Sequence, residues 1–403
     1  MKTTLNVLWV VALLGSLASA DLEWTQATSA AAWTPRSMFA AAVYANKMWL
    51  LAGRPDTNDI WWSNDGASWN LATARAQWSS RIGAAATEFQ GSLWLVGGKP
   101  RTGQVSDVWR SATGDSWTQV TGQAGWPGRP HHALLAYDNK LWVLGGGVIG
   151  GLFNDVWNSA DGVSWTRVSA GAPWSARHGH AAAVFNDRMW VLGGAEGTGQ
   201  CLRDVWYSSD GIEWTRITPA APWPARAFAA AVVFNNRLWI LGGRRDTCYH
   251  DAWYTTDGAT WIQAETGADW LPRSHFRALS YSGRLWILGG MGTDSTPLND
   301  VWFTRGTGIA EQEPAKELFR VECVPAQFRT RTEIRWGPTL TGLSQLEISD
   351  AAGRRVKTFS TAGRSAVVWD GTDELGRQVP SGVYICRLTE RQTATAVRAV
   401  LVR

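Results

Sequence analysis

The sequence predicts an all-β chain: a six-bladed β-propeller followed by a small Ig-like β-sandwich. The first observation is a segment that starts with arginine and ends in Gly-Gly, such as "RHGHAAAVFNDRMWVLGG" from Arg177, and recurs six times. The second is the spacing of the six arginines, at 45, 48, 48, 49 and 47 residues. The third is tryptophan, which is present 28 times in 403 residues, mostly at fixed places in the repeat.

The first 20 residues have the features of a secretory signal peptide. One lysine precedes an apolar run, and the small residues Ala18-Ser19-Ala20 favour cleavage before Asp21. A membrane anchor is the alternative, but the run from Val7 to Leu17 is short for a bilayer. We therefore expect a secreted protein, extracellular or at the cell surface, without a membrane span after cleavage.

One copy of the repeat contains four strand signals. Residues 181–185 and 189–192 flank the turn Asn186-Asp187, and Gly193-Gly194 ends the second strand. After a variable loop, "RDVWYSS" and "IEWTRI" flank the hairpin turn Asp210-Gly211. Four short antiparallel strands in about 48 residues predict one blade of a propeller.

The sixth copy lacks its fourth strand, because the chain runs from Trp302 into "TRGTG". Residues 22–26, "LEWTQ", resemble the fourth strands of other copies, such as "IEWTR". We therefore expect residues 21–304 to form the propeller, with the N-terminal strand closing blade six and removing exposed edges.

The Gly-Gly after strand two and the spaced tryptophans of strands three and four resemble the kelch family of propellers. This resemblance implies the fold, and the family includes enzymes, binding modules and scaffolds. Galactose oxidase is similar in fold only, because its copper site needs a Tyr joined to a Cys. Sialate mutarotases are six-bladed kelch proteins and suggest a sugar-acid isomerase, although Glu88 is the only carboxylate within a first strand here.

The arginine that starts each repeat lies where strand one begins, at the mouth of the central channel. A ring of six guanidiniums would attract carboxylates or phosphates. Alternatively, each arginine pairs with the aspartate of Asp-x-Trp in strand three and forms a structural belt. The six candidates are Arg36, Arg81, Arg129, Arg177, Arg226 and Arg273.

His132 and His180 occupy the same position in neighbouring inner strands, three residues after the repeat arginine. Two imidazoles there could bind a ligand or metal or transfer protons, and packing is the alternative. The turn carboxylates give no metal-binding spacing, so we predict no metal and no cofactor.

The four cysteines could form two disulfides in an exported protein. Cys201 and Cys248 each lie five residues before a repeat tryptophan, and Cys323 and Cys386 lie after the repeats. The natural pairing joins Cys201 with Cys248 and Cys323 with Cys386, although free thiols remain an alternative.

Residues 305–317 are polar and predict a linker, and residues 318–403 alternate like the strands of an Ig-like sandwich. The stretch "VVWDGTDELGRQVPSGVYICRL" resembles the Ig-like module of the flagellar hook-capping protein. Related end-domains of secreted bacterial proteins serve as type IX secretion sorting signals. The resemblance therefore implies a C-terminal domain for secretion or anchoring, with the secretion machinery as its partner.

The net charge of +4 is mild and no basic run is present, which argues against nucleic acid. The predicted function is non-enzymatic binding of a glycan or an extracellular protein by the rim loops, in a monomer. A carbohydrate-processing enzyme, such as a sialate mutarotase-like isomerase, is the alternative.

Overall fold

The computed structural model describes residues 22–148, 150–264, 270–304, 320–324, 327–337, 344–350, 354–361, 366–390 and 393–402. The chain divides into two compact units, Met1–Ile309 and Ala310–Arg403. The signal peptide and linker predicted at 1–20 and 305–317 lie outside the described residues. Within these residues every regular element is a strand, and no helix could cross a membrane.

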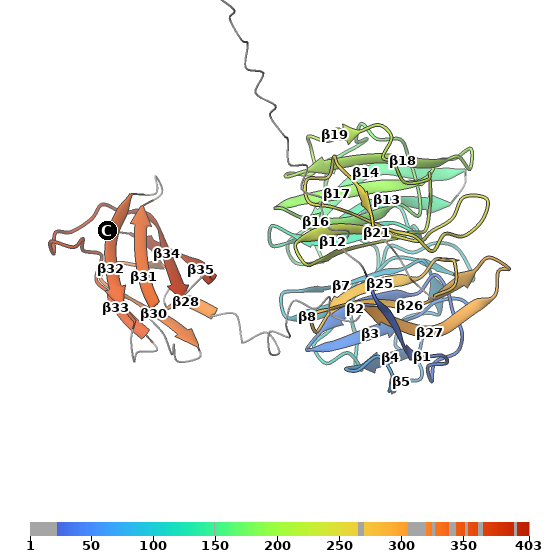
Figure 1. The fold of residues 1–403 in the computed structure, drawn as a ribbon, viewed down its shortest axis with the longest axis horizontal. Helices are drawn as coiled ribbons and strands as arrows, with labels where there is room; N and C mark the ends of the chain where they lie inside the picture. The colour runs from blue at the N-terminus through green and yellow to red at the C-terminus, as the bar shows by residue number, and fades with distance from the viewer. Residues whose placement is uncertain are drawn as a thin grey trace, which may run out of the picture. The chain divides into compact units, whose positions relative to one another are not determined.

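The first unit is a propeller of six blades, so the predicted fold class is confirmed (Figure 1). Within each blade the strands pair antiparallel, from an inner first strand to an outer fourth strand. Blade one comprises β2 (Ala40–Tyr44), β3 (Lys47–Leu51), β4 (Ile60–Ser63) and β5 (Asn70–Thr73). Blade two comprises β7 (Ala85–Phe89), β8 (Ser92–Val96), β10 (Val108–Ser111) and β11 (Thr118–Thr121), with the short pair β6 (Arg81–Ile82) and β9 (Lys99–Pro100). Blade three comprises β12 (Ala133–Tyr137), β13 (Lys140–Val148), β14 (Gly151–Ser159) and β15 (Thr166–Ser169). Blade four comprises β16 (Ala181–Phe185), β17 (Arg188–Ala195), β18 (Cys201–Ser208) and β19 (Thr215–Thr218). Blade five comprises β20 (Ala230–Phe234), β21 (Arg237–Leu241), β22 (Ala252–Thr255) and β23 (Ile262–Gln263). Blade six comprises β24 (Arg273–Ser274), β25 (Arg277–Tyr281), β26 (Arg284–Gly292), β27 (Pro297–Thr304) and β1 (Trp24–Thr28).

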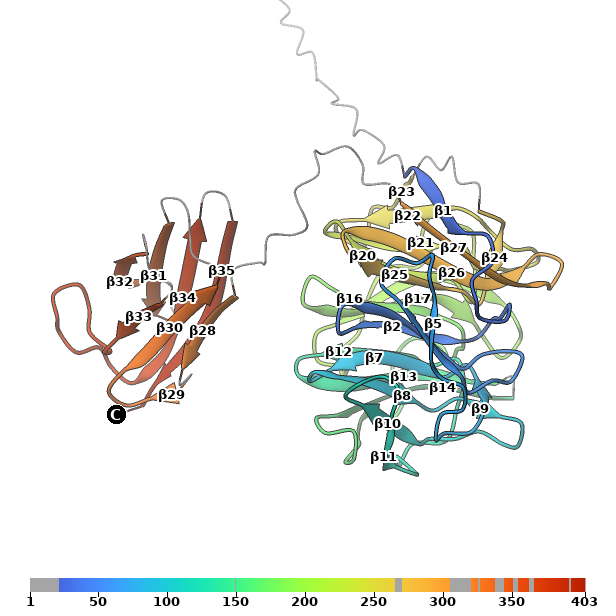
Figure 2. The ribbon, with the colours of Figure 1, turned by 90° about the horizontal axis from the view of Figure 1, so that it is seen from below.

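The N-terminal strand closes the ring. β1 pairs antiparallel with β27, and Trp24 lies opposite Thr304. Figure 2 shows the blue β1 beside the orange strands of the last blade. The side chain of Trp24 is buried and packs edge-on against Trp270, at 6.0 Å between ring centroids. The first and last blade strands in the sequence therefore share one sheet.

The strand-two tryptophans join each blade to the next. The indole Nε1 of Trp142 donates to the Tyr137 carbonyl at 2.9 Å, and the ring is buried. Its face lies over Gly211 of the next blade, where a Cβ would come within 2.3 Å of the ring. Gly211 also has φ +76°, which favours glycine. The Asp-Gly turn therefore serves both the hairpin and the contact between blades.

A second set of tryptophans lies just before the repeat arginines. Trp174 is fully buried and packs edge-on against Trp214 of the same blade, at 5.8 Å between centroids. The equivalent pairs recur in the other blades: Trp33–Trp69, Trp78–Trp117, Trp126–Trp165, Trp223–Trp261 and Trp270–Trp24. This packing explains why tryptophan is so frequent and fixes the loop that enters each blade.

The second unit is a sandwich of two sheets with its own apolar core around Trp369, Ile334 and Tyr384. One sheet has the order β28-β30-β33 and the other β29-β35-β34-β31-β32. The strands are β28 (Arg320–Val324), β29 (Gln327–Phe328), β30 (Thr332–Gly337), β31 (Ser344–Asp350), β32 (Arg355–Ser360), β33 (Ala366–Trp369), β34 (Gly382–Glu390) and β35 (Thr393–Leu401).

Candidate binding face and central channel

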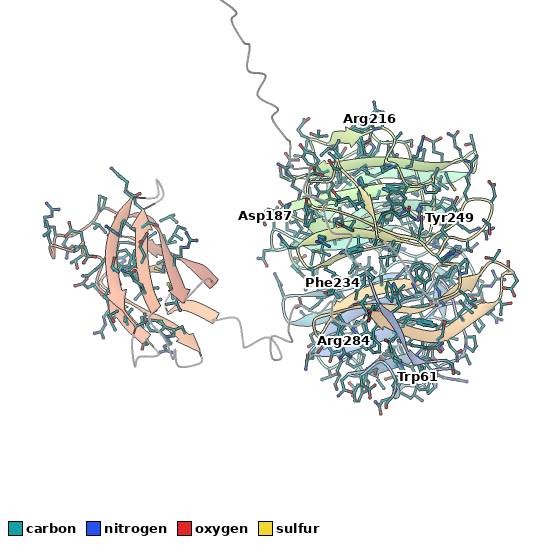
Figure 3. All side chains as sticks on the ribbon, viewed as in Figure 1. Trp61, Asp187, Arg216, Phe234, Tyr249 and Arg284 are labelled. Carbon is teal, nitrogen blue, oxygen red and sulfur yellow. The ribbon has the colours of Figure 1, made fainter. Side chains whose placement is uncertain are left out.

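The propeller has two different faces. The turns between strands one and two are short at one face, whereas the loops between strands two and three are longer at the other. Figure 3 labels Asp187, in a one–two turn, and Tyr249, in a two–three loop, on opposite sides of the propeller. The loops between blades open on the same side as Tyr249, as the sequence predicts. We call this side, with its two–three loops, the loop face.

The repeat arginines point sideways into their own blades. All five N–H groups of Arg177 are used: Nε donates to the Ser175 carbonyl at 3.0 Å, and Nη2 to the Ser175 hydroxyl at 3.1 Å. Nη1 donates to the Gly193 carbonyl at 2.8 Å, and both Nη atoms donate to Asp204 at 2.7 and 2.8 Å. The Arg177 side chain is 1% exposed, so it has no capacity left for a ligand.

The same bidentate ion pair recurs in every blade. The pairs are Arg36–Asp59, Arg81–Asp107, Arg129–Asp155, Arg177–Asp204, Arg226–Asp251 and Arg273–Asp300. We call these twelve residues the arginine belt. Burial alone would raise the pKa of Asp204, but the hydrogen bonds and charge of Arg177 outweigh it and lower that pKa below its usual value. The geometry therefore contradicts the anion-binding ring and favours the alternative of a structural belt, because the aspartates neutralise all six guanidiniums.

The candidate histidines are packed between blades. His132 and His180 are both 7% exposed and lie against Trp126 and Trp174, at 6.0 and 6.2 Å between centroids. Their ring nitrogens make no well-formed hydrogen bond within the described residues, although the Arg129 and Leu144 backbones approach closely enough to favour the charged rings slightly. Burial, with the neighbouring belt arginine, lowers the pKa of each to about 3. Phe39 and Phe276 make the same contact in other blades, so the geometry favours the packing alternative.

A closed ring of backbone hydrogen bonds surrounds the axis at the loop face. Two residues after each belt arginine, the N–H donates to the carbonyl of the equivalent residue in the previous blade, at 2.6–3.2 Å. The six residues are Met38, Gly83, His131, Gly179, Phe228 and His275. All have φ between 55° and 64°, a conformation that costs non-glycine residues energy and is held here by the ring.

Side chains from this ring close the loop-face end of the channel. Phe228 stacks on His275 at 3.7 Å, and His131 lies edge-on to Phe228 at 5.3 Å. His178, which precedes the ring residue of blade four, packs on Phe228 from another side at 5.3 Å. We call His131, His178, Phe228 and His275 the aromatic plug. His131, Phe228 and His275 each lie two residues after a belt arginine, and this shared offset is the sequence signal that could have placed them together.

The two predicted cysteine pairs have different outcomes. The bridge between Cys201 and Cys248 is wrong: Cys201 Sγ contacts the Arg244 carbonyl at 3.6 Å, and Cys248 Sγ contacts the Met291 carbonyl at 3.7 Å. Each thiol points to the next blade in the same rotational sense, so they do not face each other. Cys323 and Cys386 are also free thiols, but their sulfurs lie 3.9 Å apart in the core of the sandwich.

Acidic groups are scarce along the channel. Glu88 lies at the far end of its inner strand, and its carboxylate accepts the Gly91 N–H of its own turn at 2.9 Å. It is five residues further along the repeat than the plug residues, roughly 16 Å at 3.3 Å per residue. Among the described residues no group of three or more His, Cys, Asp or Glu could hold a metal ion. Glu88 and a channel histidine therefore do not form a facing acid–base pair.

Comparison with known proteins identifies both units. The KLHDC2/KLHL20/DRC7 Kelch-repeats domain matches residues 54–224 and 132–305, and the FlgD Ig-like domain matches residues 329–394. No curated protein matches the chain. A solved structure titled "Structure of YjhT" has a TM-score of 0.58 and 16% identity, covering 67% of this chain and 95% of that chain, which supports the fold alone. The kelch match spans more than half of the sequence, and the chain belongs to the Kelch-repeat family.

Proposed function

We propose that this protein is an exported binding module that recognises a glycan or an extracellular protein with its loop face. One observation carries the proposal: the residues that repeat in every blade are buried in contacts that hold the blades together, whereas the two–three loops differ from blade to blade. The repeated arginine, aspartate and tryptophans hold the blades together, so the loops are the part available for recognition. The C-terminal Ig-like unit would serve secretion or anchoring.

The chemistry of the two–three loops of blades one and two favours an acidic ligand. Arg54 in blade one and Lys99 in blade two are exposed and have no ion-pair partner among the described residues. Arg101 is exposed nearby and pairs with Asp56 at 3.3 Å. Exposed cations on a rigid scaffold can attract carboxylated sugars or acidic peptides at little cost in ordering.

Array binding tests the proposal directly. The chain without residues 1–20 would be applied to arrays of acidic and neutral glycans and of acidic peptides. We expect binding to an acidic class, weakened about tenfold or more by Arg54→Ala with Lys99→Ala, because each charged hydrogen bond contributes about 1.5–3 kcal/mol. Lys140→Ala with Arg284→Ala removes the same charge near the one–two turns and should leave binding unchanged. Equal losses in both double variants would reject the loop face.

The carbohydrate-enzyme alternative requires a different result. A sugar-acid isomerase would interconvert its substrate in a catalytic rather than stoichiometric manner, and Glu88→Gln would reduce that rate. We favour the binding module because Glu88 caps its own turn and faces no histidine. Turnover of an acidic sugar that is lost in Glu88→Gln would replace our proposal with the alternative.

A further inference from the structure

One arginine in the propeller stands outside the repeat pattern. Four residues after the belt arginine, at the start of each inner strand, five blades have alanine and the sixth has Arg277. The alanines are Ala40, Ala85, Ala133, Ala181 and Ala230. The inner strands of neighbouring blades contact one another all round the axis, so this position borders the channel. A single long cation therefore replaces a methyl group at one point of the ring.

Arg277 is almost unpartnered. Its Nη1 donates to the Phe276 carbonyl at 3.1 Å, and this is its one hydrogen bond among the described residues, where it also has no ion pair. Four of its five N–H groups thus lack a protein acceptor. Burial lowers the pKa of Arg277 to about 10, so the group remains charged at neutral pH. A guanidinium in this position needs water or an anion to replace its lost hydration.

The surroundings place this cation beneath the aromatic plug. Burial is the main cause of the lowered pKa values of His131, His132 and His275, and the charge of Arg277 contributes to all three. These histidines come from blades three and six, on opposite sides of the axis. The charge of the guanidinium therefore reaches across the channel to blade three as well as His275 of its own blade.

Small side chains line the inner strands at the next position. Ala86, Ala182, Ala231 and Ala278 lie one residue further along the inner strands and are only partly buried, and Arg277 itself is partly exposed. Their partial exposure indicates that solvent reaches the inner strands at this level. Among the described residues the site thus combines one cation without an ion pair, small apolar neighbours along the inner strands and no carboxylate partner.

We propose that the central channel binds one small carboxylate monoanion, held by the Arg277 guanidinium below the aromatic plug. The planar fork of the guanidinium matches the two oxygens of a carboxylate. A monoanion fits because Arg277 is the one cation on the six inner strands, whereas Lys99 and Arg244, whose charges also reach His131 and His275, belong to the two–three loops. The pKa of His131 is about 3, so this ring is neutral at pH 7. A dianion such as sulfate would keep one negative charge unbalanced. This site is separate from the loop face and does not depend on the function proposed for it.

Acetate titration tests the site with the whole mature chain. The protein would be held in Tris sulfate at constant ionic strength, and sodium acetate binding followed by calorimetry and by the melting temperature. We expect saturable binding at one site per chain, weakened at least about tenfold in Arg277→Ala. That variant restores the residue of the other five blades, so it should fold. Arg203→Ala removes an exposed arginine from blade four and should bind acetate like the original protein.

Several results would overturn the proposal. Acetate that does not saturate, or binds Arg277→Ala equally well, would show that the channel holds no such site. Tighter binding of phosphate than of acetate would contradict selection for a monoanion. A marked fall in melting temperature for Arg277→Ala without acetate would assign Arg277 a structural role instead. Acetate binding lost with Arg277 while array binding persists would establish two independent sites.

Discussion

Arg273 and Arg277 lie four residues apart in blade six and have opposite fates. Arg273 donates to the Leu271 and Gly289 carbonyls and to both oxygens of Asp300, and it recurs in every blade. Arg277 donates to one carbonyl and has no counterpart in the other blades. In a repeat protein, a residue present in every copy is explained first by architecture. A departure from the repeat is the better guide to a binding site.

The strongest test of the repeated architecture concerns β1, the N-terminal strand that completes blade six. Deleting residues 22–28 should lower the free energy of unfolding by about 5 kcal/mol or more. Leu22 and Trp24 lose burial, at about 1.5–3 kcal/mol each, and the hydrogen bonds to β27 contribute about 1 kcal/mol each. Urea unfolding would measure the change, with the exposed Glu23→Ala as a control. An unchanged unfolding midpoint would mean that β1 is not needed to close the ring.

The next largest effect should come from the arginine belt. Arg177→Ala leaves the Asp204 carboxylate buried without its cation, which costs about 3–5 kcal/mol. The exposed Arg203→Ala should change stability by less than about 0.5 kcal/mol. Urea unfolding compares the two, and binding at the loop face should persist wherever Arg177→Ala remains folded. An Arg177→Ala protein that keeps its stability but no longer binds the ligand would show that the arginine belt is a binding site.

Much of this architecture was predictable from the sequence, because blade geometry follows from spacing. The six arginines, the Asp-x-Trp strands and the missing fourth strand of blade six led to the ring and its closure. The partner of each arginine was left open, because periodicity does not fix the direction of a long side chain at a rim. The structure resolves this through Gly193 and Ser175, whose carbonyls fix the Arg177 guanidinium beside Asp204.

The site was harder to predict for two physical reasons. The equivalent positions of Cys201 and Cys248 predict a disulfide, but the rotation from blade to blade directs each thiol toward the following blade. The two sulfurs therefore do not face each other. Arg277 occurs in one blade only, so the periodicity that predicts the blades gives no signal for it. The sequence contains five alanines and one arginine in the same register, yet only the structure shows that no carboxylate of the described residues pairs with that arginine.

The buried histidines distinguish packing from proton chemistry through their pH dependence. The pKa of His132 and His180 is about 3 when folded, against about 6.5 when unfolded. Between these values the unfolded chain binds more protons, so stability falls as the pH drops from 6.5 toward 3. From pH 7 to 5 each histidine should cost about 2 kcal/mol.

Replacing both histidines with phenylalanine, as at Phe39 and Phe276, should remove this part of the acid sensitivity. Unfolding would be measured in urea at pH 7 and pH 5. Loss of stability from the belt aspartates is expected at lower pH, because the pKa of Asp204 lies below its usual value. An identical loss between pH 7 and 5 in His132→Phe/His180→Phe would show that these rings are not kept neutral by burial.

The smallest expected effect tests whether burial, rather than ion pairing itself, makes the belt structural. Arg101 and Asp56 form another arginine–aspartate pair, through a single hydrogen bond at 3.3 Å between loops of blades one and two, and their side chains are 81% and 30% exposed. Solvent screens such a pair and ordering the long side chains opposes it, so a double-mutant cycle should give a coupling below about 1 kcal/mol. Arg177 and Asp204, at 1% and 14% exposure, should give a coupling several times larger. Equal couplings would mean that burial does not set the strength of the belt. Neither loop residue supports the core, so Arg101→Ala should leave the free energy of unfolding unchanged. The same variant should weaken the binding of any acidic ligand to the loop face.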